Sequence, residues 1–170
     1  MLTLFLMSLS AFAIEPPPPS TPPAPEVDRD LGMRLYLSGG DAVVGTNHGA
    51  FASLGAQVVQ QGGLIGGALG AELSAFQPSG SEGVLPVINL DASLRFTPWP
   101  DGRVVPYVSG GLGVSVLIII PFPDLTLSLG AELPIGELRL YAELHGRSIL
   151  PLYPGTEQVN VSSLRLGVGF

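Results

Sequence analysis

Three residues close to position 145 are of types that could do chemistry together. Glu143, His145 and Ser148 could serve as acid, base and nucleophile, because acyl transfer needs a hydroxyl group held against an imidazole. The alternation of polar and apolar residues, however, predicts that His145 points inward while Ser148 belongs to a loop. His48 has no partner close in sequence. The sequence therefore identifies no catalytic residue, and we predict that the protein is not an enzyme.

Other chemistry is also disfavoured by composition. The chain has no Cys, which removes thiolate metal sites and disulfides, and it shows no phosphate-binding glycine loop and no neighbouring His pair. All seven basic residues are Arg, and the formal net charge of -7 leaves no cationic patch for a phosphate backbone. We expect no cofactor, no metal and no nucleic-acid partner.

The remaining charged residues follow a positional rule. From 137 to 145, apolar Leu or Ala alternates with charged or polar residues, so that each kind occupies one face of a strand. The charged residues that share the polar face in this and other segments are Arg34, Glu72, Asp91, Arg95, Glu132, Glu137, Arg139, Glu143 and Arg165. Their charges nearly balance, which predicts a buried network of ion pairs.

The elements that position these residues are short strands. Twenty-three Gly with many Ser, Val and Leu favour strands and turns, and after residue 14 no apolar run approaches the ~20 residues of a spanning helix. The period of two recurs in eight segments: 31–37, 50–59, 64–76, 88–96, 107–116, 125–133, 137–145 and 159–170. The predicted class is all-β, in one domain.

The beginning of the chain predicts export. Residues 1–13 form an apolar run that closes on Ala11-Phe12-Ala13, the small-x-small pattern of a signal-peptide cleavage site, although a plain membrane anchor is the alternative. Residues 14–29 are rich in Pro and favour an extended periplasmic linker. A ligand for a proline-binding domain is a second interpretation of this segment.

The last strand carries the most specific pattern. Leu164, Leu166, Val168 and the terminal Phe170 share one face, and small or polar residues share the other. In this motif the chain resembles bacterial outer-membrane barrels, whose last strand commonly ends in an aromatic residue that the insertion machinery recognises. The resemblance implies that Leu166, Val168 and Phe170 form a C-terminal insertion signal.

Residues 30–170 as a whole resemble the OmpA-transmembrane and OmpX-like group, in strand count, alternation and terminal aromatic residue. The resemblance implies an eight-stranded antiparallel up-and-down transmembrane β-barrel in the bacterial outer membrane, with both termini in the periplasm. It also implies contact with outer-membrane lipid and with the barrel-insertion machinery, and we expect a monomer. The proline-rich segment and the short external loops depart from the group, and such loops offer little surface for adhesion.

Connections of two lengths are expected to alternate. The predicted periplasmic turns are 60–63, 97–103 and 134–136, and the predicted external loops are 38–49, 77–84, 117–123 and 147–158. Aromatic girdles are predicted from Phe96, Trp99 and Phe170 on the periplasmic side and from Phe76, Phe122 and Tyr153 on the outer side. The apolar run in 116–123 is expected to lie against lipid or to offer a patch for a partner.

A soluble barrel of lipocalin type is the competing architecture, with the Leu-rich face inside. The polar face, however, consists largely of Gly, Ser and Thr, whereas a soluble exterior carries many long charged side chains. An Arg at mid-membrane on the lipid side costs roughly 2 to 4 kcal/mol, so the Arg-bearing face is predicted to point inward. The sequence therefore favours a membrane barrel.

Eight strands enclose an interior that side chains just fill, so no wide channel is expected. We predict a structural envelope protein with a plugged lumen; the alternatives are a narrow channel for ions or small solutes and, remotely, a lipid A-modifying enzyme. If Ile135-Gly136 forms a two-residue turn, Glu132 lies opposite Arg139 and Tyr141 lies over Gly130.

Overall fold

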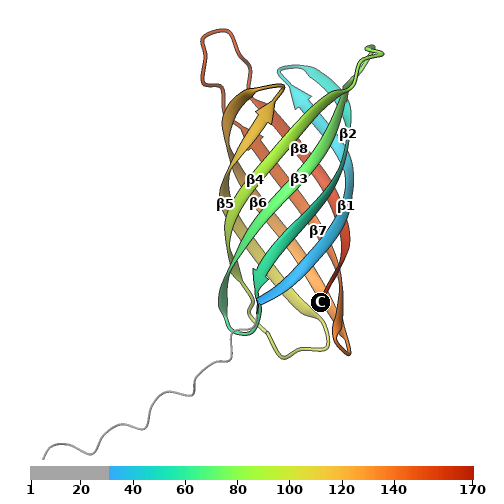
Figure 1. The fold of residues 1–170 in the computed structure, drawn as a ribbon, viewed down its shortest axis with the longest axis vertical. Helices are drawn as coiled ribbons and strands as arrows, with labels where there is room; N and C mark the ends of the chain where they lie inside the picture. The colour runs from blue at the N-terminus through green and yellow to red at the C-terminus, as the bar shows by residue number, and fades with distance from the viewer. Residues whose placement is uncertain (1–30) are drawn as a thin grey trace, which may run out of the picture.

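The computed structural model describes residues 31–170, which form a closed barrel of eight antiparallel strands (Figure 1). The strands are β1 (Leu31–Val44), β2 (Asn47–Gln60), β3 (Ile65–Pro78), β4 (Leu85–Phe96), β5 (Val105–Leu117), β6 (Ile120–Ile135), β7 (Leu138–Ile149) and β8 (Val159–Gly169). Each strand pairs with its neighbours in sequence, and β8 closes the barrel on β1. The predicted fold class and strand count are confirmed. The predicted signal peptide (1–13) and linker (14–29) lie outside the described residues.

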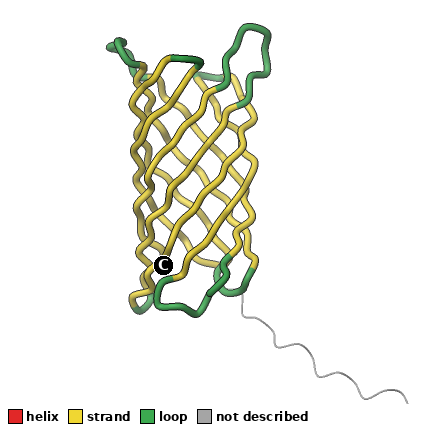
Figure 2. Tube along the Cα trace, turned by 180° about the vertical axis from the view of Figure 1, so that it is seen from behind, coloured by secondary structure: helices red, strands yellow, loops and turns green. Residues whose placement is uncertain are grey.

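The strands are strongly staggered around the barrel. A path along paired residues that leaves β1 at Arg34 passes Asp91 and Asp124 and returns to β1 at Val44, ten residues further on. Such a stagger requires tilted strands, typically by 35 to 45° in small barrels. The tilt is plain in Figure 2, where strands cross the wall obliquely and loops lie only at the two ends. Residues 31–170 contain no helix that is long and apolar enough to cross a membrane.

The two faces of the wall differ in chemistry as the alternation predicts. Leu69, Leu94 and Leu127 are 65 to 71% exposed on the outside, whereas Arg165 is 1% exposed inside. Because successive side chains of a strand point to opposite faces, one register decides the position of every residue in that strand. The outer surface is therefore apolar and the lumen polar.

The strands extend beyond their predicted ends on the side away from Phe170, which we call the far end. The predicted loop 38–49 is reduced to a turn at 45–46, and the predicted loop 117–123 to a turn at 118–119. The other two loops span 79–84 and 150–158. Gly39 and Gly40 have a weak strand preference, but pairing with β2 on one side and β8 on the other holds them in the sheet.

The turn between β6 and β7 is displaced by one residue from its predicted position. Gly136 and Glu137 form the turn, Ile135 pairs with Leu138, and Gly136 has a φ of 63°. A two-residue hairpin needs positive φ at its first loop position, which Gly adopts without strain and the β-branched Ile135 does not. The predicted cross-strand pairing of Glu132 with Arg139 is therefore wrong, since Glu132 lies opposite Tyr141.

The aromatic girdle is only partly as predicted. Phe96, Trp99 and Phe170 are exposed at the end where β8 terminates, which we call the Phe170 end. At the far end, Phe76 instead packs inside the barrel, because it follows the outward-facing residues of β3 by one position. Phe122 shares the inward parity of β6 and packs edge-on against the ring of Tyr153, with ring centroids 6.1 Å apart.

Candidate functional site in the barrel lumen

The Glu132 cluster lies near the Phe170 end and consists of Glu132, Arg34, Arg95 and Arg139. Nη1 of Arg95 lies 2.6 Å from Oε1 of Glu132, and Nη1 of Arg139 lies 3.4 Å from Oε2. Arg34 forms a third ion pair with the same carboxylate. These residues come from β1, β4, β6 and β7, so the contacts cross the lumen. One acidic side chain thus holds three guanidinium groups together.

The Arg165 cluster occupies the middle of the barrel and consists of Arg165, Glu72 and Glu143. Arg165 donates hydrogen bonds to Glu72 at 2.5 Å and to Glu143 at 3.1 Å. Tyr36 and Tyr107 donate their hydroxyl hydrogens to Glu72 and Glu143, at 2.9 and 2.8 Å. Charge-assisted bonds of this kind are stronger than neutral ones, so both carboxylates are held from two sides.

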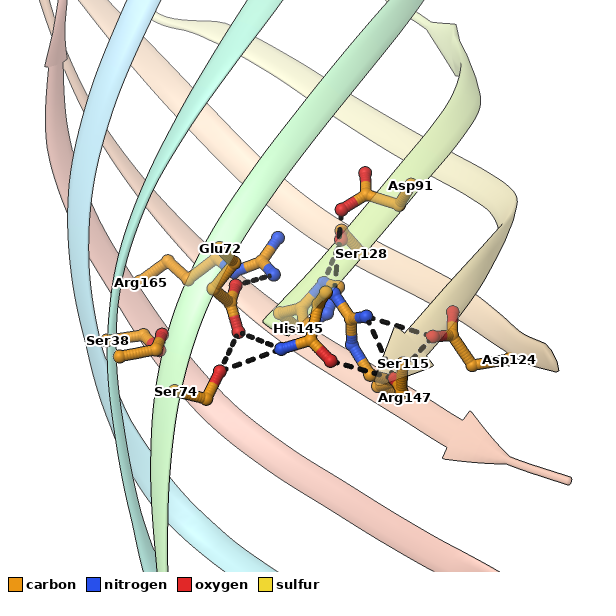
Figure 3. A network of polar contacts seen from close by, with 12 residues as sticks. Ser38, Glu72, Ser74, Asp91, Ser115, Asp124, Ser128, His145, Arg147 and Arg165 are labelled. Atoms are coloured by element: carbon orange, nitrogen blue, oxygen red, sulfur yellow. Dashed lines mark hydrogen bonds and ion pairs between the residues drawn. The ribbon is translucent and has the colours of Figure 1, made fainter. Parts of the chain in front are cut away.

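The Arg147 cluster lies toward the far end and consists of Arg147, Asp91 and Asp124 (Figure 3). Arg147 pairs with Asp124 at 3.0 Å and with Asp91 at 3.5 Å. The hydroxyl oxygen of Ser115 lies 2.6 Å from Oδ2 of Asp124 and 2.7 Å from Oδ1 of Asn89, and it can donate its hydrogen to either oxygen. Arg147 was not predicted to face the lumen because it lay in a predicted loop, and Asp124 was not among the predicted charged set. Continued alternation beyond His145 and before Leu125 was the signal for both.

Tyrosines fill the space between the clusters. Arg95 lies 3.8 Å from the ring centroid of Tyr107, Arg165 4.6 Å from that of Tyr36, and Arg34 4.9 Å from that of Tyr141. Guanidinium groups over aromatic faces gain cation–π attraction. Each ring is opposite a glycine of the next strand, in the pairs Tyr36–Gly55, Tyr107–Gly130 and Tyr141–Gly167. The prediction that Tyr141 lies over Gly130 is wrong, because the register of β7 differs.

Eight of the nine predicted charged residues meet in these clusters, and Glu137 does not. Glu137 is the second residue of the exposed β6–β7 turn and cannot reach the lumen. Its inclusion followed from extending the alternation of β7 by one residue past the start of that strand. The described lumen clusters contain five Arg and five carboxylates, of which all but Arg139 are buried.

The three residues that could form a catalytic triad are not arranged as one. Nδ1 of His145 lies 2.9 Å from the hydroxyl of Ser128 and 3.6 Å from Glu143, so one ring nitrogen faces both groups. A triad requires the two nitrogens to face different partners. Ser148 is bonded instead to Asn160, at 3.0 Å, among exposed side chains. Within residues 31–170, no group of three or more His, Cys, Asp or Glu is arranged to hold a metal ion.

The proposed insertion signal is part of the last strand. Leu166, Val168 and Phe170 are 39 to 54% exposed on the outer face. The backbone N–H and carbonyl of Phe170 both bond to Met33, at 2.9 and 2.8 Å. The terminal residue is thereby fixed to β1 at the strand pair that closes the barrel.

Comparison with solved structures bears directly on this fold. The chain is similar to the crystal structure of Neisserial surface protein A (NspA), with a TM-score of 0.67 and 13% identity over 82% of this chain and 95% of that chain. It is similar to the outer membrane enzyme PagL, with a TM-score of 0.61 and 12% identity over 79% and 97% of the two chains. The chain has the fold of a small outer-membrane β-barrel.

A third similar structure is the outer membrane protein OprG from Pseudomonas aeruginosa, with a TM-score of 0.52 and 12% identity over 83% of this chain and 95% of that chain. At such identities the likeness shows the fold alone. No protein-family model and no curated protein matches the chain.

Proposed function

We propose that the protein is a structural component of the bacterial outer membrane whose lumen is closed by its own side chains. The observation that carries the proposal is the stack of three ion-pair clusters, each joining strands on different sides of the barrel. Eight strands leave an interior that side chains can fill, and here Arg and Tyr side chains fill it. We infer that these side chains leave no room for a continuous water path.

The same clusters explain why such a plug would stay in place. Removing one partner of a buried ion pair leaves an uncompensated charge and typically costs about 3 to 5 kcal/mol. Opening a path past Arg165 would break its contacts with both Glu72 and Glu143. The closed arrangement is therefore the low-energy one, and a narrow ion channel is the alternative that conductance decides.

We predict that purified full-length protein in planar lipid bilayers shows no stable conductance steps. Arg165→Ala should leak, because it leaves two buried carboxylates without their shared cation. Leu164→Ala, the matched change on the lipid-facing side of the same strand, should remain closed. A stable, ion-selective pore in the wild-type protein contradicts the closed lumen and favours the channel.

The proposal includes no catalytic role, because Ser148 is bonded away from His145 and His145 is buried in the lumen. Lipid A is the substrate that a membrane-embedded acyl-transfer enzyme would encounter. We predict that mass spectrometry of lipid A from expressing and non-expressing cells shows the same acyl pattern. Loss or gain of an acyl chain upon expression would contradict this part of the proposal.

The membrane arrangement completes the proposal. We infer that the apolar outer wall contacts outer-membrane lipid, that the Phe170 end faces the periplasm, and that the protein is a monomer. The barrel-insertion machinery would recognise Leu166, Val168 and Phe170. Ile118 and Ile119, 78 and 83% exposed at the β5–β6 turn, would then contact lipid at the outer boundary.

A further inference from the structure

The lumen changes character at the far end, above the Arg147 cluster. Inward positions that are Gly, Ser or charged elsewhere are apolar here, and they come from β1, β2, β3, β4, β7 and β8. The side chains that form this wall are Ala42, Phe51, Phe76, Val87, Ile149 and Val161. They enclose a cavity of about 550 Å³ inside the barrel mouth, which we call the apolar cup.

The side chains that form the wall of the apolar cup pack against one another. Ala42, Phe51 and Val161 are at most 8% exposed and form a packed cluster, against which Phe76 and Val159 also pack. A mouth that only met water would be expected to carry polar side chains, as the lumen below it does. Concave, mostly apolar spaces of 300 to 1,000 Å³ with few polar groups are typical of small-molecule sites.

The floor of the apolar cup determines the charge of its occupant. Arg147 and Asn89 line the bottom, and their polar groups already have partners within the protein. Arg147 is bonded to Asp124 and Asp91, while the amide nitrogen of Asn89 donates to Ser74 at 2.7 Å. A charged ligand would have to break these contacts or leave its own charge unpaired in an apolar space, which is costly.

We propose that the apolar cup binds a small, uncharged apolar molecule. The polar lining residues Asn47 and Ser79 stand at the strand ends that form the rim, so a weakly polar group of the ligand would face outward. At about 550 Å³ the apolar cup has room for an apolar molecule larger than two fused aromatic rings, so naphthalene can enter it without steric conflict. The site goes beyond a structural role, and conductance measurements do not bear on it.

The proposal is tested by titrating naphthalene into the full-length protein in lipid nanodiscs. Methyl NMR then measures the chemical-shift changes at each naphthalene concentration. We expect saturable shifts at the methyl groups of Val87, Ile149 and Val161. The methyl groups of Leu69 and Leu94 on the outer wall should show only the linear change of partitioning into lipid. Equal, non-saturable changes on both sides of the wall would overturn the proposal.

Two variants separate the apolar cup from the outer wall. Ala42→Phe places an additional ring in the cup and should weaken saturable naphthalene binding at least tenfold, whereas Ala50→Phe, which adds the same ring on the outward face of the neighbouring strand, should leave it unchanged. Phe51→Ala removes an apolar ring from the wall of the cup and should also weaken naphthalene binding. Naphthalene affinity that is unaltered by both Ala42→Phe and Phe51→Ala in folded protein would overturn the assignment.

Sodium decanoate distinguishes a free apolar molecule from the acyl chain of an anionic amphiphile. The lining of the apolar cup offers a carboxylate no unpaired cation, because its basic residue, Arg147, already pairs with Asp91 and Asp124 and the rim residues Asn47 and Ser79 are uncharged. Decanoate is therefore expected to bind at least tenfold more weakly than naphthalene. Decanoate binding that is equal or tighter would contradict an uncharged ligand.

Discussion

Glu132 is the residue on which the Phe170 end of the lumen depends. Its carboxylate pairs with guanidinium groups from three strands, and it is 1% exposed. No second carboxylate lies in this cluster among the described residues, so nothing substitutes for Glu132 if it is neutralised. Its side chain joins β6 to β1, β4 and β7 from the inside.

We predict that Glu132→Gln lowers the free energy of unfolding by about 3 to 5 kcal/mol, because it leaves buried arginines without their counter-charge. Glu137→Gln, the same chemical change in the exposed turn, should alter stability by less than about 0.5 kcal/mol. Urea titrations of folding into lipid vesicles, followed by gel mobility, measure both. Equal effects of the two substitutions would show that the cluster contributes little.

The sequence predicted which charged residues face inward better than it predicted their partners. Alternation fixes the face of Arg34, Arg95 and Arg165, because one parity applies along each strand. Partners depend on register and on which strands face each other across the lumen, and neither is encoded locally. The displaced turn at Gly136 altered the expected pairing of Glu132, and the loop assigned around Arg147 concealed a whole cluster.

At the scale of the strand pair, each large inward-facing tyrosine ring needs a glycine opposite it, as Tyr107 has in Gly130. A Cβ added to Gly130 would lie 2.6 Å from Cζ of Tyr107 and 2.9 Å from the backbone carbonyl oxygen of Ala142. The backbone of β7 cannot retreat without disturbing its ladder. Gly110 faces outward, and a Cβ there would lie no nearer than 3.8 Å to the carbonyl oxygen of Thr126.

Gly130→Ala is therefore expected to destabilise the barrel by about 1 to 3 kcal/mol through overpacking. Gly110→Ala should be neutral or stabilising by up to about 1 kcal/mol, because glycine in a strand loses more conformational freedom than alanine. The same vesicle-folding titration compares the two variants. A larger loss in Gly110→Ala than in Gly130→Ala would contradict the assigned faces of β5 and β6.

Element existence and type followed from sequence, whereas element ends did not. The period of two identified all eight strands, since it reflects two different environments on the two sides of one wall. At the far end, pairing continues through Gly39, Gly40 and Asp41, which have weak strand preference on their own. There the barrel, rather than local sequence, determines where the strands stop.

The whole molecule separates two solvents with a single layer of strands. The outer wall exposes leucine side chains, whose contact with water is unfavourable, and the lumen buries charged side chains, whose contact with lipid would be unfavourable. Closing β8 onto β1 leaves no open strand edge. These three properties together require a bilayer around the barrel and explain why the polar groups are concentrated at its axis.

Membrane fractionation combined with heat-dependent gel mobility tests this arrangement most directly. We predict that the full-length protein is recovered in the outer-membrane fraction and that unheated and boiled samples migrate differently, because the closed barrel resists unfolding by detergent at room temperature. Outward Leu127→Ala should preserve both properties as a control. Recovery in the soluble fraction, or identical mobility before and after boiling, would contradict a transmembrane barrel.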